Sequence, residues 1–200
     1  PLATLRSQVC IVAQDTFLFS DTIGSNISFG AGDRGNRLEY NGQYDGQRRR
    51  RGYDEQYVRH MAAIAGADGF ISSMPDGYDT VVGERGVGLS GGQKQRLSLA
   101  RALADNPSIL IMDDTTSAVD METEAEIQRH LRDLDEKKTI VTIAHRISSV
   151  KDSDLILVLE HGRIVERGTH DELVASHGRY WQIYSKQLGV DAGRSQGFEA

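Results

Sequence analysis

The chain has 200 residues, a hydrophobic fraction of 38% and a formal net charge of −6. This length allows one sizeable core, so we expect one domain, and the scattered basic residues argue against nucleic acid as a partner. Cys10 is the only cysteine, which excludes an internal disulfide and a zinc site built from cysteines and fits a reducing compartment. No apolar run approaches the roughly 18 residues that a membrane-spanning helix needs.

Short apolar runs predict the strands of a parallel α/β sheet. They cover residues 9–13, 109–112, 139–144 and 155–159. Runs of this length are typical of strands that are buried on both faces. Apolar spacing and end signals predict helices over residues 55–65, 92–104 and 122–134.

The last part of the chain predicts a different arrangement. Gly162 and Gly168 bracket residues 163–167, which indicates a hairpin or an edge strand. Residues 169–172 then have the capping pattern that opens a helix.

One motif stands directly before the helix predicted at residues 92–104. It consists of Leu89, Ser90, Gly91, Gly92 and Gln93. Adjacent glycines let the backbone approach a ligand, and a helix start offers free amides and a positive dipole end, so we expect an anion site. An ordinary helix cap is the alternative, because serine and glycine are common at helix starts. No stretch reads G-x-x-x-x-G-K-[ST], the loop that cradles phosphates in P-loop proteins.

Polar residues follow or end the first three apolar runs: Gln14, Asp113 and His145. Ligands of open parallel sheets bind beyond the carboxyl ends of the strands. An amide, a carboxylate and an imidazole at that edge suit Mg²⁺, a nucleophilic water and a terminal phosphate. Taken singly, each could also be a structural residue that merely ends a buried strand.

The order and context of these segments resemble the nucleotide-binding domain of ATP-binding cassette (ABC) ATPases over nearly the whole chain. On this resemblance Gln14 lies in the Q-loop and helps to hold Mg²⁺, and residues 89–93 are the signature motif. Asp113 ends the Walker B strand as a metal ligand, Asp120 closes the D-loop, and His145 is the catalytic switch histidine. The resemblance implies an α/β fold with a partial RecA-like P-loop NTPase core, a mostly parallel sheet and the ABC helical subdomain, with ATP and Mg²⁺ as cofactors.

The resemblance also implies a domain organisation. Residues 1–190 are expected to form an incomplete nucleotide-binding domain, with a helical subdomain at about 20–105 and core segments at 1–19 and 106–190. Residues 31–53 contain the basic run 48–51 and predict a mobile insertion, with contact to anionic lipid headgroups as the alternative. Residues 191–200 are expected to be a disordered tail.

In this family two such domains enclose two ATP molecules head to tail, and each site joins one subunit's Walker motifs to the other's signature. Residues 14–19 and 83–86 are similar to elements that meet the transmembrane partner in exporters, although Phe17 and Phe19 could also belong to the core. The resemblance therefore implies the ATPase part of an exporter at the cytoplasmic face of the cell membrane. Its partners would be a second nucleotide-binding domain and a transmembrane domain, not nucleic acid.

Two departures from the family pattern change this expectation. Asp114 stands where the family has a catalytic glutamate, and a misplacement of about 1 Å can cost on the order of a hundredfold in rate. We therefore expect a degenerate site that binds Mg-ATP but hydrolyses it slowly, in a heterodimer with one working site or in a slow homodimer. Without a phosphate loop, these 200 residues alone should bind ATP weakly and leave apolar strand edges uncovered. A non-catalytic regulatory or dimerisation module and a soluble ABC ATPase are the alternatives.

Overall fold

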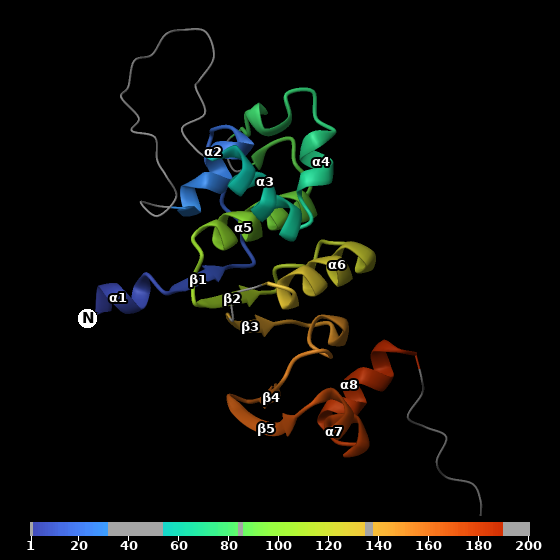
Figure 1. Cartoon of the computed structure of the whole chain (residues 1–200). Helices are drawn as coiled ribbons and strands as arrows, with labels where there is room; N and C mark the ends of the chain where they lie inside the picture. Colours follow the sequence, from blue (N-terminus) through green and yellow to red (C-terminus); the bar gives the residue numbers. More distant parts are fainter. Residues whose placement is uncertain (1, 32–53, 84–85, 135–137, 190–200) are drawn as a thin grey trace, which may run out of the picture. The chain divides into compact units, whose positions relative to one another are not determined.

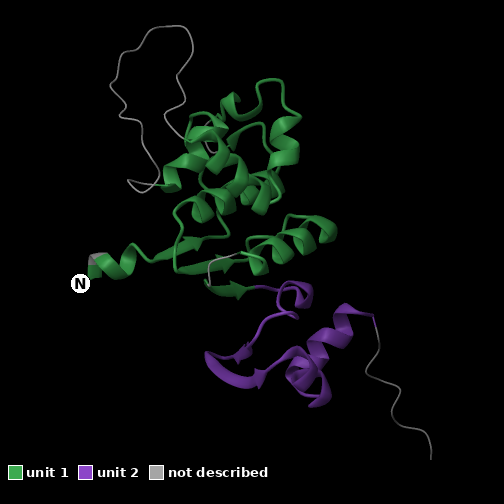
Figure 2. Ribbon diagram, in the orientation of Figure 1, with its two compact units in different colours: residues 1–143 green, residues 144–200 purple. Residues whose placement is uncertain are grey.

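The computed structural model describes residues 2–31, 54–83, 86–134 and 138–189 (Figure 1). The basic run at 48–51, most of the expected insertion at 31–53 and the expected tail at 191–200 lie outside these residues. The chain divides into two compact units, residues 1–143 and 144–200 (Figure 2). None of the described helices is long and apolar enough to cross a membrane.

A three-stranded parallel sheet forms the base of the first unit, in the order β1-β2-β3. The strands are β1 (Val9–Val12), β2 (Ile109–Asp113) and β3 (Thr139–Ile143). Val12 pairs with Met112, and Asp113 pairs with Ile143. This sheet confirms three of the predicted strands and the parallel α/β class.

The remaining elements of the first unit are helical. They are α1 (Leu2–Arg6), α2 (Ile23–Ser28), η1 (Phe29–Ala31), α3 (Glu55–Ile64), α4 (Asp68–Ser72), η2 (Gly77–Asp79), α5 (Gly91–Ala104) and α6 (Met121–Arg132). Helices α3, α5 and α6 confirm the three predicted helices to within two residues at their ends. Local signals explain this agreement, because Asp54 caps α3 through the amides of Gln56 and Tyr57 and Ser90 caps α5.

The hydrophobic core lies between one face of the sheet and the helices. On that face Val12, Leu110 and Met112 are at most 3% exposed, and they pack in one cluster with buried side chains of α2, α3 and α5. The other face is open: Ile11 is 62% exposed and Ile143 is 51% exposed. The expectation that these strands are buried on both faces is therefore wrong for the described residues, since the helices pack on one side only.

The second unit is a hairpin with two short helices. It contains η4 (Ile147–Ser149), β4 (Ile156–Glu160), β5 (Arg163–Gly168), α7 (His170–Ala175) and α8 (Arg179–Gln187). A small cluster of buried residues holds it together: Ile147, Ile156, Val158, Leu173 and Tyr180. The hairpin predicted around residues 163–167 and the helix predicted after Thr169 are confirmed.

The fourth apolar run does not join the parallel sheet, which corrects that expectation. Within the described residues, β4 pairs antiparallel with β5. His161 and Gly162, the two residues of the turn, have φ values of 49° and 75°. Positive φ at both positions is the conformation that closes a tight hairpin, so the chain folds back at once instead of crossing over to another strand.

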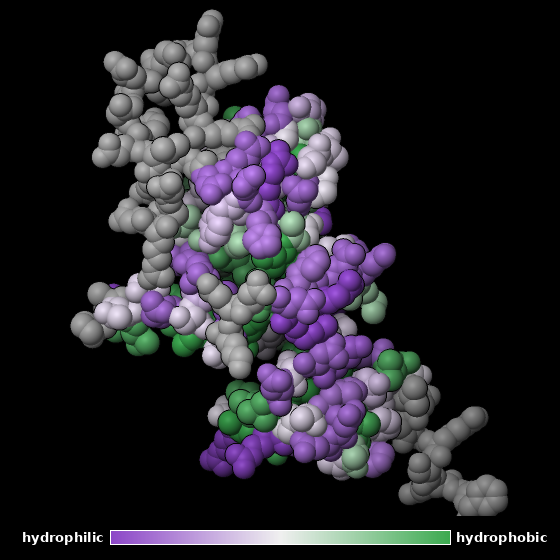
Figure 3. Space-filling view, viewed as in Figure 1, coloured by the Kyte–Doolittle hydropathy of each residue, from purple (hydrophilic) through white to green (hydrophobic). Residues whose placement is uncertain are grey.

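Apolar side chains also reach the surface of the hairpin. Leu157 is 45% exposed and Leu159 is 66% exposed on β4, and Ile164 is 58% exposed on β5. Figure 3 shows apolar surface over this hairpin and near β1. Both units therefore present apolar strand surface to solvent.

Candidate functional site

The loop before α5 is closed by a reciprocal pair of hydrogen bonds. Ser90 Oγ accepts from the Gln93 amide at 3.2 Å, and Gln93 Oε1 accepts from the Ser90 amide at 2.9 Å. This capping box fixes Ser90 at the first turn, while Ser90 and Gly91 stay exposed. The helix-cap alternative therefore describes the local geometry of Ser90. It leaves the start of a long helix presented to solvent, as an anion site requires.

Gly92 is explained by a close approach between two backbones. A Cβ atom at this position would lie 2.6 Å from the carbonyl oxygen of Ala118, which is closer than Cβ atoms approach other atoms in real structures. The N-terminus of α5 thus packs directly against the loop that follows β2. The structure brings the predicted signature motif and the predicted D-loop together in one chain.

Asp113 and Asp114 occupy the carboxyl end of β2. The register places Asp113 on the open face of the sheet with Ile143, and its side chain is half-buried. Asp114 is in the left-handed region with φ of 48°, a conformation that aspartate tolerates better than most residues. Its amide donates to the carbonyl oxygen of Ile143 at 2.9 Å, so the end of β3 holds the backbone of Asp114 in place.

Gln14 leaves the sheet at the same edge. It lies two residues beyond the end of β1, and its side chain is exposed. The hydroxyl of Thr115, one residue after Asp114, donates to the carbonyl oxygen of Val12 at 3.3 Å. The structure therefore brings Gln14 close in the fold to the two aspartates, as the ends of neighbouring parallel strands require.

The oxygen atoms of Asp113 and Gln14 suit a magnesium ion that is bound together with a nucleotide. Mg²⁺ is usually held by one or two carboxylates together with phosphate oxygens and waters. Asp113 offers one half-buried carboxylate at the strand end, and Gln14 offers an amide oxygen at the same edge. In the part of the chain that the structure describes, no three His, Cys, Asp or Glu side chains form a metal cage.

Asp120 has a structural role that the structure makes explicit. It caps α6: its Oδ1 accepts from the Thr123 amide at 2.9 Å and its Oδ2 accepts from the Thr123 hydroxyl at 2.9 Å. The amide hydrogen bond, followed by the hydroxyl one, holds the pKa of the Asp120 carboxyl below its usual range. A role toward a nucleotide would have to be compatible with this cap.

His145 follows β3 and belongs to the second unit, whereas Asp113 and Asp114 belong to the first. Its side chain is exposed. Its carbonyl oxygen accepts from Gln187 Nε2 at 2.7 Å, and Gln187 Oε1 accepts from the Ile147 amide at 2.9 Å. Gln187 on α8 therefore clamps the backbone on both sides of Arg146. Sequence reasoning missed Gln187, because its partners lie about 40 residues earlier in the chain.

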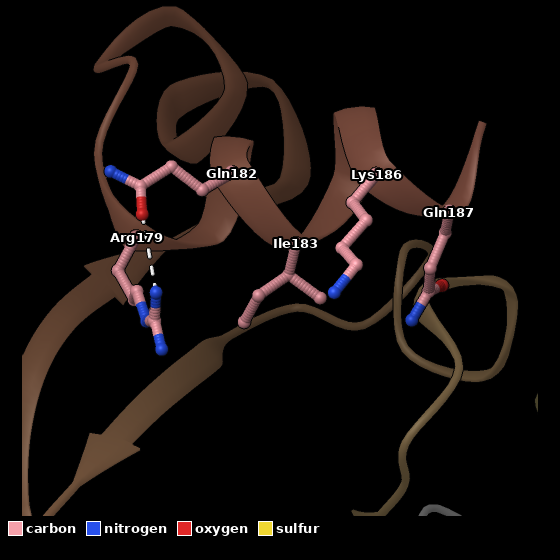
Figure 4. Close-up of a pocket in the computed structure, with 5 residues that line it drawn as sticks. All are labelled: Arg179, Gln182, Ile183, Lys186 and Gln187. Atoms are coloured by element: carbon pink, nitrogen blue, oxygen red, sulfur yellow. Dashed lines mark hydrogen bonds between the residues drawn. The ribbon is translucent and has the colours of Figure 1, made fainter. Parts of the chain in front are cut away.

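Gln187 also lines a hollow on α8 with Arg179, Gln182, Ile183 and Lys186 (Figure 4). Within it, Arg179 Nη1 donates to Gln182 Oε1 at 3.2 Å. None of the predicted nucleotide-binding residues lines this hollow.

The segment after Gln14 is anchored by two residues that the sequence did not single out. Asn26 is 1% exposed; its Oδ1 accepts from the Phe19 amide at 2.8 Å, and its Nδ2 donates to the Phe19 carbonyl at 3.0 Å. Arg101 on α5 donates to Asn26 Oδ1 at 2.6 Å and to the carbonyl oxygen of Phe17 at 2.8 Å. Burial lowers the pKa of the Arg101 guanidinium.

This anchoring presents aromatic side chains at the surface. Phe17 and Phe29 are each 56% exposed and Phe19 is 37% exposed. The Phe17 and Phe19 rings meet edge to face at 5.2 Å, and Phe19 lies 4.6 Å from Phe29. The guanidinium of Arg101 stands over the Phe19 ring at 5.1 Å. We refer to Phe17, Phe19 and Phe29 as the aromatic patch.

Comparisons with known proteins agree with this geometry. The chain matches the family model described as ABC transporter over residues 2–117. It is 50% identical over 186 residues to the uncharacterized ABC transporter ATP-binding protein YknU of Bacillus subtilis. The aligned residues cover 93% of this chain and 28% of that protein. It is 43% identical over 188 residues to the ATP-dependent lipid A-core flippase of Photobacterium profundum, with 94% and 29% covered.

Among solved structures, a bacterial Atm1-family ABC exporter with ATP bound is similar with a TM-score of 0.79 and 41% sequence identity. The match covers 94% of this chain and 30% of that one. The chain thus spans less than a third of the length of these relatives. Because the family model matches more than half of the chain, this protein belongs to the ABC transporter family.

Proposed function

We propose that this chain is part of the ATP-hydrolysing engine of an exporter and that it offers residues 89–93 to the ATP of a partner domain. The observation that carries the proposal is the start of α5, a 14-residue helix whose N-cap Ser90 and first residue Gly91 stay exposed. Its amides and dipole suit the phosphates of a nucleotide. The names of the relatives support export, since they include a flippase and an exporter.

The chain's own residues have distinct roles in this proposal. Asp113 and Gln14 hold Mg²⁺, which when bound neutralises charge on the phosphates. Asp114 orients and deprotonates the attacking water, and His145 stabilises the terminal phosphate. Asp120, besides capping α6, faces the partner's nucleotide.

The carboxylate of Asp114 makes this chain's own site slow. Aspartate is one methylene shorter than glutamate, and its left-handed backbone is tied to β3 through the Ile143 carbonyl, so it cannot easily shift toward a water. The partner's site, completed by residues 89–93, is free of this defect if the partner carries a glutamate. A heterodimer with one fast site follows, and a slow homodimer is the outcome if both subunits are this chain.

The partners in this proposal are a second nucleotide-binding domain and a transmembrane domain at the cytoplasmic face of the cell membrane. The aromatic patch supports the second of these, because exposed clustered aromatic rings are typical of protein contacts. Arg101 and Asn26 connect the patch to α5 by hydrogen bonds. A displacement of the patch by a bound partner would therefore be transmitted to the helix that carries the signature. The 200 residues alone are proposed to bind ATP weakly and to be inactive.

The substitution Asp114→Glu in the full-length transporter tests this proposal. We expect ATP turnover at this chain's own site to rise by about one to two orders of magnitude, because the longer side chain restores the position of the base. Steady-state ATPase rates of the purified protein measure the change, with Asp133→Glu, at the end of α6, as the matched control. An unchanged rate for Asp114→Glu would refute the base-replacement argument.

A further inference from the structure

Gln95 lies one turn into α5 and is 6% exposed, and both ends of its side-chain amide are used. Oε1 accepts from the Ala118 amide at 3.0 Å. Nε2 donates to Ser117 Oγ at 3.1 Å and lies 3.4 Å from the carbonyl oxygen of Asp114. Because a backbone amide only donates, the contact with Ala118 fixes which end of the Gln95 amide is oxygen. All three contacts fall on one loop, residues 114–118.

This loop sets the orientation of Asp114. Ser117 Oγ donates to the Asp114 carbonyl at 2.9 Å, and Gln95 approaches the same hydroxyl and the same carbonyl. The contacts form a chain of hydrogen bonds that strengthen one another in a buried setting. A left-handed aspartate persists only where its surroundings hold it, and Gln95 is one of the groups that do so.

The same helix carries the signature motif. Gly92 lies one turn before Gln95, and its α-carbon packs against the Ala118 carbonyl so closely that a Cβ atom would be 2.6 Å away. Gln95 holds the amide of the same Ala118. The N-terminus of α5 and the loop after β2 are therefore joined at two points one helical turn apart, so neither shifts without the other.

We infer that Gln95 is a positioning residue that couples two ATP sites. It links Asp114, which acts at this chain's own site, to residues 89–93, which this chain offers to the partner's site. The inference rests on the proposed function, since it requires the signature to act in the partner's site. Beyond that function, Gln95 is the side chain through which a shift of the signature at the partner's site changes the position of Asp114 at this chain's own site.

A double-mutant cycle in the full-length transporter tests this coupling. Gln95→Leu keeps the volume and the burial of the side chain but removes all three hydrogen bonds. We expect it to lower kcat for ATP about tenfold, to change KM less than about threefold, and to reduce the gain from Asp114→Glu to less than about twofold. Gln95→Glu keeps an acceptor for the Ala118 amide and loses the donors, so its kcat should lie between that of the unsubstituted protein and that of Gln95→Leu. Gln95→Glu is used in place of Gln95→Leu if that variant does not fold.

Leu99→Ala is the matched control, because Leu99 is buried on α5 and its substitution leaves the polar groups of Gln95 and of residues 114–118 in place. An Asp114→Glu gain that is equally large with and without Gln95→Leu would overturn the coupling. So would a gain that Leu99→Ala erases to the same extent, because general loosening of α5 would then suffice. A transporter that turns over no ATP refutes the proposed function and this inference together. If Asp114→Glu alone gives no gain, only the base argument fails, and kcat of Gln95→Leu against Leu99→Ala still decides the coupling.

Discussion

At the residue scale, the site combines side chains with local roles and side chains with distant partners. Ser90, Gly92 and Asp113 could be predicted, because a capping serine, a glycine pair and a strand-ending carboxylate are visible in a short stretch of sequence. Gln95 and Arg101 could not. Their partners lie between 19 and 84 residues away, so their roles depend on packing that a local pattern does not encode.

Asp120 offers a residue-scale prediction that separates its two roles. Asparagine caps a helix about as well as aspartate, whereas alanine does not, and losing a cap costs about 1 kcal/mol. We expect Asp120→Asn to leave hydrogen exchange at the Thr123 amide unchanged and Asp120→Ala to accelerate it about fivefold. ATP turnover of the full-length protein should fall for both variants, because both remove the charge that we propose to face the partner's nucleotide. Normal ATP turnover of Asp120→Asn would contradict a role of Asp120 toward the nucleotide and would leave capping of α6 as its only role.

At the element scale, the three longer helices of the first unit were predictable, and the partner of the fourth apolar run was not. The helices α3 and α6 begin at capping aspartates, so their signals lie within the helix itself. Strand β4 has the same apolar character as β1 to β3, yet it pairs with β5 because the turn at His161 and Gly162 folds the chain back. Which strand pairs with which is set by turns and by long-range packing, and composition alone does not decide it.

The contact between α5 and the segment after Gln14 is a second prediction at this scale. Lysine cannot reproduce the directed contacts that Arg101 makes with Phe17 and Asn26, and hydrogen bonds to a charged group are worth about 1.5–3 kcal/mol. We expect Arg101→Lys to accelerate hydrogen exchange at the Phe19 amide by about tenfold or more. Arg59→Lys is the control, since Arg59 pairs with Glu55 on the exposed side of α3. Equal exchange in both variants would show that Arg101 does not hold the segment.

At the scale of the whole molecule, the two units expose apolar strand faces and a helix start. Ile11 and Ile143 lie on the open face of the parallel sheet, and Leu159 lies on the hairpin. The proposed function needs a partner at the start of α5 and a transmembrane domain at the aromatic patch. Its central claim is that each ATP site is shared, with Asp113 from one subunit and Ser90 from the other.

Complementation between two inactive variants tests that claim most directly. The test uses dimers in which both subunits are this chain: Ser90→Arg blocks the signature and Asp113→Asn removes the metal ligand, both in full-length protein carrying Asp114→Glu so that turnover is measurable. We mix differently tagged copies, isolate the mixed dimers by both tags and measure ATP hydrolysis. If sites are shared, each variant alone is inactive and the mixed dimer regains about half of the parent rate, because one of its two sites has both intact residues. Isolated mixed dimers without turnover would contradict the account, since they would place Ser90 and Asp113 in the same site of one subunit.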